Sequence, residues 1–141
     1  MNQGLKIIAD KNGKRLAEII LSDQKVEKTT FFSKPESAFQ FGFVAHKKGY
    51  EEDAHYHKKI EKKISDVSQV LFVQKGMVAV DFYNEDKTKL AEVILKKGDA
   101  INIITGIHRI RVLDDCQCLT VKQGPFLSDE MDKVGVSFIN K

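Results

Sequence analysis

The chain has 141 residues, of which 42% are hydrophobic and 30% are charged, so we expect one domain with a single core covering residues 1–141. Its formal net charge is only +3, and its lysines are scattered among acidic residues, which gives no reason to expect a nucleic-acid partner. No apolar run approaches membrane-spanning length, and the first residues lack the charged and apolar regions of a signal peptide. We therefore expect a cytoplasmic protein without a membrane partner.

Residues 1–38 are predicted to form an N-terminal β-hairpin followed by a loop. Leu5–Ala9 and Leu16–Leu21 are apolar segments on either side of Asp10–Lys14. The Asn-Gly pair in this turn favours the positive backbone angles of a hairpin. The stretch Ser33–Ser37 contains a proline between polar residues and is expected to lead as a loop into the main sheet.

Short strand patterns separated by turn residues continue through the rest of the chain. They cover residues 39–44, 69–74, 77–83, 90–95, 100–104, 109–113 and 119–121. Many short strands with no long helical period predict an all-β chain folded as an antiparallel sandwich or barrel. Residues 126–141 have no strong pattern and are expected to form a C-terminal tail.

His55-Tyr56-His57 is the first candidate functional motif. In an extended segment alternate side chains share a face, so both imidazoles project the same way and can bind one ion. By itself the pair is equally compatible with a solvated edge, since Lys58 and Lys59 follow it. A third imidazole, His108, opens a later strand after the turn Thr105-Gly106.

Around the first motif, the chain resembles the cupin superfamily. Gly49, five residues and then His55-Tyr56-His57 match the start of that family's first motif, and Gln69 with Gly76 after six intervening residues matches its end. The segment between His57 and Gln69 is longer than usual, and a glutamine stands where the family places a glutamate. Glu61 is the alternative acidic position, but no glycine follows it at the required spacing.

The second motif of the same family is matched by Gly98-Asp99, a strand, Gly106 and His108, with Ile104 where a proline is common. The resemblance covers residues 39–125. It implies that this part of the chain is an antiparallel double-sheet jelly-roll barrel. Because N-terminal strands of related small cupins pair with a neighbouring subunit, it also implies a homodimer.

The resemblance implies a metal site formed by four side chains: His55, His57, Gln69 and His108. Three neutral imidazoles and an amide oxygen suit a divalent transition metal such as zinc, nickel, iron or manganese, and these ligand types do not select one of them. The glutamine carries no negative charge, so we expect a bound dication to be held more weakly and to act as a stronger Lewis acid than beside a carboxylate.

Strand alternation assigns faces to the candidate residues. If His108 points into the barrel, Ile110 and Val112 do too, while Arg109 and Arg111 face outward as surface or interface charges. By the same rule His55 and His57 point inward and Tyr56 outward, and Gln69 shares its face with Leu71 and Val73.

The candidate catalytic residues are Tyr50 and Glu52, which precede the histidine pair in the sequence. A carboxylate here can act as a general base or orient a histidine, although an acidic surface loop has the same composition. Three functions stay open. They are a metal-dependent isomerase, epimerase or dioxygenase acting on a compact polar or sugar-like small molecule, a metal-free sugar-nucleotide isomerase or epimerase that uses the histidines as acid and base, and a non-catalytic protein that binds a small ligand.

Overall fold

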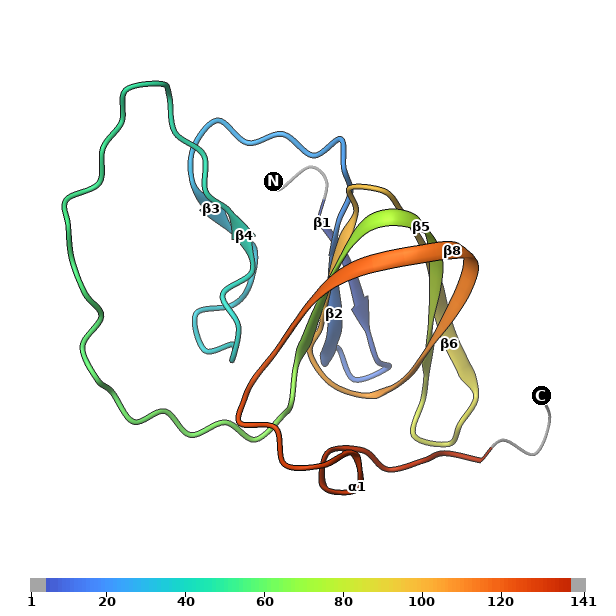
Figure 1. Cartoon of the computed structure of the whole chain (residues 1–141). Coiled ribbons are helices and arrows are strands. Elements are labelled where there is room, and N and C mark those ends of the chain that lie inside the picture. The colour runs from blue at the N-terminus through green and yellow to red at the C-terminus, as the bar shows by residue number, and fades with distance from the viewer. Residues whose placement is uncertain (1–4, 138–141) are drawn as a thin grey trace.

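The computed structural model describes residues 5–137 and is built almost entirely from antiparallel β-strands (Figure 1). In chain order the elements are β1 (Leu5–Ala9), β2 (Arg15–Ile20), β3 (Thr30–Phe31), β4 (Gly42–Phe43), β5 (Gln69–Tyr83), β6 (Lys89–Lys96), β7 (Ala100–Ile103), β8 (Ile107–Lys122) and the single-turn helix α1 (Asp129–Asp132). The all-β class predicted from the sequence is confirmed. Among residues 5–137 no helix is long and apolar enough to cross a membrane.

Strand β5 is the centre of the six-stranded sheet, whose order is β1-β2-β7-β5-β6 with β8 along the other edge of β5. The first part of β5 pairs with β7 and the second part with β6, while β8 pairs with β5 over almost its whole length. Register shifts between Val73 and Val78 interrupt the pairing of β5 with β8. Such bulges bend a strand and increase its twist, so the sheet curls into a half-barrel.

The predicted N-terminal hairpin is confirmed, since β1 and β2 pair antiparallel across the turn after Ala9. The Asp10 carboxylate accepts hydrogen bonds from the backbone N–H groups of Asn12 and Lys14, at 2.8 Å and 2.9 Å. Gly13 has a φ of +79°, as the Asn-Gly pair requires. Strand β2 then joins β7, so the hairpin belongs to the main sheet.

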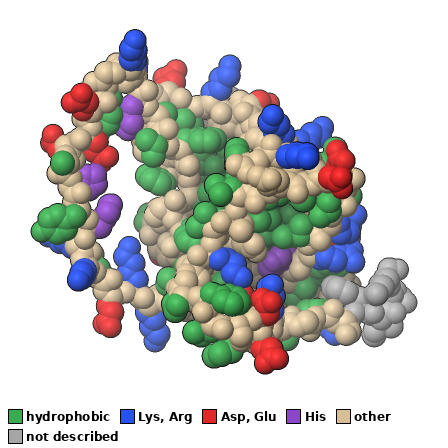
Figure 2. All heavy atoms as spheres, viewed as in Figure 1, with side chains coloured by type: hydrophobic (Ala, Val, Ile, Leu, Met, Phe, Trp, Pro, Cys, Tyr) green, Lys and Arg blue, Asp and Glu red, His purple; other side chains and the backbone are tan. Residues whose placement is uncertain are grey.

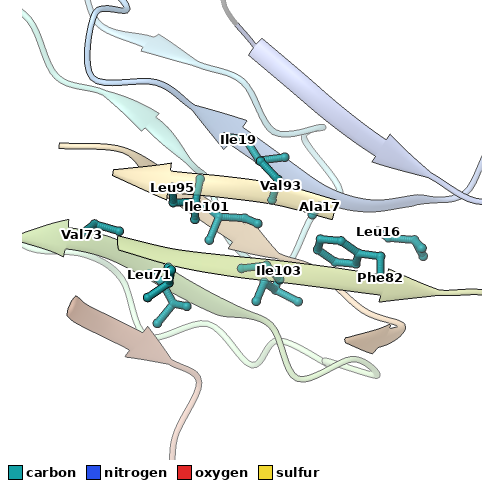
Figure 3. Packing of buried hydrophobic residues seen from close by; sticks show 12 residues of the cluster. Leu16, Ala17, Ile19, Leu71, Val73, Phe82, Val93, Leu95, Ile101 and Ile103 are labelled. Atoms are coloured by element: carbon teal, nitrogen blue, oxygen red, sulfur yellow. The ribbon is translucent and has the colours of Figure 1, made fainter. Parts of the chain in front are cut away.

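Two apolar clusters lie on opposite faces of this sheet. The larger one fills the concave face with side chains from β2, β5, β6 and β7 (Figure 3), including the fully buried Phe82, Leu95 and Ile101. The smaller one joins Ile20 to Phe32 and Phe41, which flank the two-stranded β3–β4 ribbon. The ribbon therefore covers the convex face of β2 and its neighbours.

A long segment of irregular structure, residues 44–67, joins β4 to β5 and is called the arm here. Figure 1 shows it as a wide green loop that runs away from the sheet. From residue 51 to residue 67 every side chain is exposed. The sheet thus forms an open half-barrel, and the arm, expected to supply an inward-facing histidine strand, lies outside it.

Gly76 and Gly13 offer a matched test of the bend in β5, since both have a positive φ, +83° and +79°. A Cβ at Gly76 would overlap the carbonyl oxygen of Asp115, whereas a Cβ at Gly13 would meet no atom within 4 Å. We expect Gly13→Ala to lower the free energy of unfolding by about 1 kcal/mol. Gly76→Ala should cost at least about 2 kcal/mol more, measured by urea unfolding. Equal costs would show that the close approach of β8 does not constrain β5.

Candidate functional site

His55 and His57 lie side by side on the arm. Their ring centres are 5.3 Å apart and their planes are nearly perpendicular, at 83°. An ion about 2.1 Å from one nitrogen of each ring, at a roughly tetrahedral angle, places two ring centres about 5 Å apart. The spacing of the pair is therefore compatible with one ion held between the two rings, although both side chains are exposed in this chain.

The tautomer of His55 is set by its own backbone. Its Nδ1 lies 2.9 Å from the carbonyl oxygen of Asp53. Because a carbonyl oxygen can only accept, Nδ1 carries the proton, and Nε2 keeps the lone pair that binds metals or protons. The carboxylate of Glu52, a predicted catalytic residue, lies 3.9 Å from the same Nδ1, which is farther than the carbonyl oxygen of Asp53.

His108, on β8, has the same arrangement as His55. Its Nδ1 donates to the carbonyl oxygen of Gly106 at 2.9 Å, which again leaves the Nε2 lone pair available. It pairs across the strands with Phe82, and their ring centres are 6.5 Å apart. The backbone of Gly106 takes a φ of +96°, so the turn that supplies this carbonyl suits glycine.

The face assignments on β8 agree with the strand register. His108, Ile110 and Val112 pair with the core residues Phe82, Val80 and Val78. Residues directly opposite in an antiparallel pair share a face, so the first three belong to the concave side. Among residues 5–137 no strand covers them on that side, and Ile110 and Val112 are 39% and 61% exposed.

Gln69 begins β5 on the concave face, where its amide nitrogen donates to the hydroxyl of Thr120 at 3.0 Å. It pairs with Lys122 at the end of β8, whereas His108 pairs with Phe82 near the end of β5. Gln69 and His108 are therefore at opposite ends of the β5–β8 ladder, joined by a strongly curved surface.

Within residues 5–137 the structure does not bring three or more metal-ligating histidine, cysteine or carboxylate groups together. Figure 2 shows histidines along the arm and another on the main body, separated by open space. The physical reason lies in the arm. From residue 51 to residue 67 its backbone forms no hydrogen bond with the backbone of the sheet, so the inward orientation expected for His55 and His57 is not seen in the single chain.

Tyr50, the other predicted catalytic residue, sits at the base of the arm. Its ring stacks on His46 with ring centres 3.8 Å apart, and His46 Nε2 lies 3.3 Å from the hydroxyl of Thr29. The Tyr50 backbone N–H closes a turn on the carbonyl of Lys47 at 3.2 Å. These contacts give Tyr50 and His46 a role in fixing the start of the arm.

Arg109 and Arg111, predicted to be outward-facing charges, both bind the buried carboxylate of Asp81. Arg111 does so with two hydrogen bonds of 2.7 Å and 2.9 Å, and Arg109 with bonds of 3.1 Å and 3.3 Å. Lys89 lies 3.2 Å from the same carboxylate. The bonds from Arg111 above all hold the pKa of Asp81 well below its usual range, against the opposing effect of burial.

A second buried carboxylate, Glu18, was not singled out from the sequence. It is fully buried on β2 and accepts hydrogen bonds from Ser33 and Asn102, both at 3.2 Å, and from Arg15 at 3.3 Å. Its sequence signal is an acid inside an otherwise apolar strand. Ser33 leads into the segment that covers the convex face, so Glu18 ties that segment to the sheet.

A hollow of about 710 Å³ opens at the end of the sheet where three turns meet. Lys11 and Asn12 of the β1–β2 turn and Glu85 of the β5–β6 turn line one part of it. Ile107, the first residue of β8, lines another. Ile107 immediately precedes His108. The volume lies in the range of small-molecule sites, and it is next to a candidate functional residue.

Comparison of the chain with models of known protein families, with curated proteins and with solved structures finds no match. The function must therefore be argued from the residues themselves.

The ion cluster around Asp81 predicts a specific pH dependence. The folded pKa of Asp81 is depressed below its ordinary value of 3.8, so the stability that this residue contributes is present above about pH 4 and is lost as the pH falls below it. We expect Asp81→Asn to cost about 2 kcal/mol at neutral pH, since the partner guanidinium groups are partly exposed.

Urea unfolding of the wild type and Asp81→Asn, at about pH 7 and about pH 3, should show the difference between them shrinking in acid. Asp23→Asn, at an exposed position that forms no ion pair with any of residues 5–137, is the matched control and should cost under about 0.5 kcal/mol at neutral pH. A difference between wild type and Asp81→Asn that grows in acid would contradict the assignment.

Proposed function

We propose that this chain is a cupin-type protein that binds a divalent transition metal through His55, His57 and His108 and acts on a compact polar or sugar-like small molecule. One observation carries the proposal. His55 and His108 each donate Nδ1–H to the carbonyl of the residue two positions earlier, which leaves the Nε2 lone pair of each ring available to a ligand. Metal-binding histidines generally hold their second nitrogen in this way.

The chemistry of the donor set fits such an ion. Imidazole nitrogens suit zinc, nickel, iron and manganese, and the 5.3 Å separation of the His55 and His57 rings suits two ligands of one ion. Gln69 has its amide nitrogen engaged by Thr120, so its oxygen is the atom left to bind or to accept a hydrogen bond near the metal. A bound dication would polarise a carbonyl or hold an enediol or carboxylate of the substrate.

The residues around the site support small-molecule chemistry. Glu52 is close enough to His55 to orient it or, after a small movement, to exchange a proton with a bound molecule. The hollow beside Ile107 is lined by both polar and apolar side chains and offers a space for a compact hydroxylated substrate. The reaction types that we propose are isomerisation, epimerisation or oxygen-dependent cleavage of such a molecule.

The proposal extends to the fold. Within residues 5–137 no strand pairs with the outer edge of β8, and residues 51–67 of the arm form no backbone hydrogen bond with the sheet. When the arm joins the sheet, the half-barrel becomes the closed double-sheet jelly roll that the sequence motifs imply, and the two halves of the metal site meet.

The second candidate function needs no metal. A histidine with a nearby carboxylate is also the arrangement of a general acid–base pair, and His55 and Glu52 form one at 3.9 Å. In that case the histidines move protons on a sugar nucleotide and the arm carries the catalytic pair.

The metal proposal is tested by replacing the histidines one at a time. We expect the wild type, purified without an affinity tag, to bind about one zinc or cobalt ion per chain, measured by elemental analysis and titration. His55→Ala, His57→Ala and His108→Ala should each lose the ion because each removes a ligand. His46→Ala is the matched control and should retain it, since His46 contacts Thr29 and Tyr50.

A wild type that takes up no divalent metal under any loading condition would overturn the metal proposal. Proton exchange from a sugar nucleotide by a metal-free wild type would then establish the second candidate.

The role of Gln69 is tested by giving it a charge. Gln69→Glu should raise the affinity for zinc or cobalt by about tenfold or more, because a carboxylate is a better ligand than an amide. Competition with a chelator measures this change. Gln74→Glu adds the same charge at an exposed position on the same strand and should leave the affinity unchanged. No gain from Gln69→Glu would place Gln69 outside the metal site.

A further inference from the structure

Strand β8 has one free edge along its whole length in the part of the chain that the structure describes. Residues 107–122 pair only with β5, and the other row of backbone N–H and C=O groups meets no strand. Long unpaired edges promote association with another strand, and folded proteins usually shorten, charge or cover them. Here the edge spans 16 residues and its concave side carries the exposed Ile110 and Val112.

The arm has the complementary property. It is extended and exposed, and its apolar side chains are in water, with Tyr56 89% and Ile60 66% exposed. An extended segment without contacts gains nothing that offsets the entropy of holding one shape. A surface that covers Tyr56 and Ile60 would therefore stabilise the middle of the arm, and residues 5–137 of the same chain do not supply one.

Both ends of the arm are fixed to its own sheet. At the start, the backbone of Ala45 donates to Thr29 at 3.1 Å. At the end, the Asp66 carboxylate accepts from Thr105 at 3.0 Å and the Ser68 hydroxyl donates to the carbonyl of Ile104 at 3.0 Å. Residues 51–63 of the arm run away from the sheet (Figure 1), whereas Ile64 and Val67, near its end, line a hollow together with Lys122, the last residue of β8.

We propose that the arm of a second copy of this chain adds as a strand to the free edge of β8, so that His55 and His57 of one copy and His108 of the other form one shared metal site. Each copy then gives one arm and receives one, which closes a two-fold dimer and covers the start of the free edge of β8. The shared site rests on the proposed function, whereas the exchange of the arm rests on the free edge and the exposed arm alone.

The charges favour an antiparallel arm. In that direction, with His55 opposite His108, Glu52 lies opposite Arg111 on the outer face. A parallel arm in the same position would set Lys58 opposite Arg111, and like charges directly opposite are destabilising. Directly opposite residues have Cβ atoms about 5 Å apart, so His57, two residues along, is also within reach of His108.

Mixing two inactive variants tests the shared site. His55→Ala/His57→Ala lacks the arm ligands and His108→Ala lacks the strand ligand, so each alone should bind no cobalt. Coexpressed in equal amounts, half of the dimers are mixed and each mixed dimer has one intact site of two. Cobalt absorption should therefore recover to about a quarter of the wild-type capacity. A wild type that binds cobalt, together with a mixture that recovers none, would place the whole site within one chain and overturn the inference.

The exchange of the arm is tested without metal, so that it can be separated from the proposed function. Sedimentation should show a wild-type dimer, and hydrogen exchange should show protection in it of residues 51–56 and of residues 107–112 of β8, which face them. Val112→Lys should weaken the dimer by about tenfold or more, because it places a charge under the docked arm. Ile94→Lys on β6, at a similarly exposed apolar position, is the matched control and should leave the dimer intact.

A dimer with a protected arm that binds no metal would refute the proposed function and retain the exchange. A monomeric wild type, or a dimer in which residues 51–56 exchange hydrogen as fast as an unfolded chain, would overturn the arm exchange itself.

Discussion

The double-sided pairing of β5 is the constraint on which the rest of the structure depends. This strand is 15 residues long and takes β7 and β6 in turn on one edge and β8 on the other. The curvature that turns a flat sheet into a half-barrel comes from the bulges between Val73 and Val78, where Gly76 packs against the backbone of β8. The bend shifts the register by one residue, so odd-numbered residues before it and even-numbered residues after it face the concave side. Leu71 and Val80 therefore lie in the same core.

The two faces of this curved sheet are used differently. The convex face buries charged groups that are fully paired, with Glu18 under the segment leading to β4 and Asp81 under two arginines. The concave face is apolar where β2, β5, β6 and β7 meet and uncovered along β8. The concave side of β8, where Ile110 and Val112 are exposed, is also the side that carries His108.

Local sequence signals predicted the elements whose structure is decided by neighbours in the chain. The Asn-Gly turn identified the N-terminal hairpin, and strand alternation correctly separated His108 from Arg109 because a period of two is a property of any extended segment. Long-range pairing could not be predicted in the same way. The residues next to Asp81 in the sequence do not predict that Arg109 and Arg111, 28 and 30 residues later, bind it.

The arm shows the same limit for the candidate site. The spacing of His55 and His57 predicted their proximity, which the structure has, but their position relative to His108 depends on where residues 44–67 pack. The long, lysine-rich interval between His57 and Gln69 was visible in the sequence, and it is the interval that lets the arm leave the sheet. Motif spacing alone describes which residues can meet and leaves open which chain supplies each of them.

The composition of the arm has a consequence for the lifetime of a lone chain. Four lysines, Lys58, Lys59, Lys62 and Lys63, stand exposed between the histidine pair and β5. Extended, unprotected backbone is what proteases cleave, so an enzyme of trypsin-like specificity would cut the chain there first. Such a nick separates the histidine pair from the strand that carries His108, and it falls between β4 and β5, so each strand of the half-barrel stays intact.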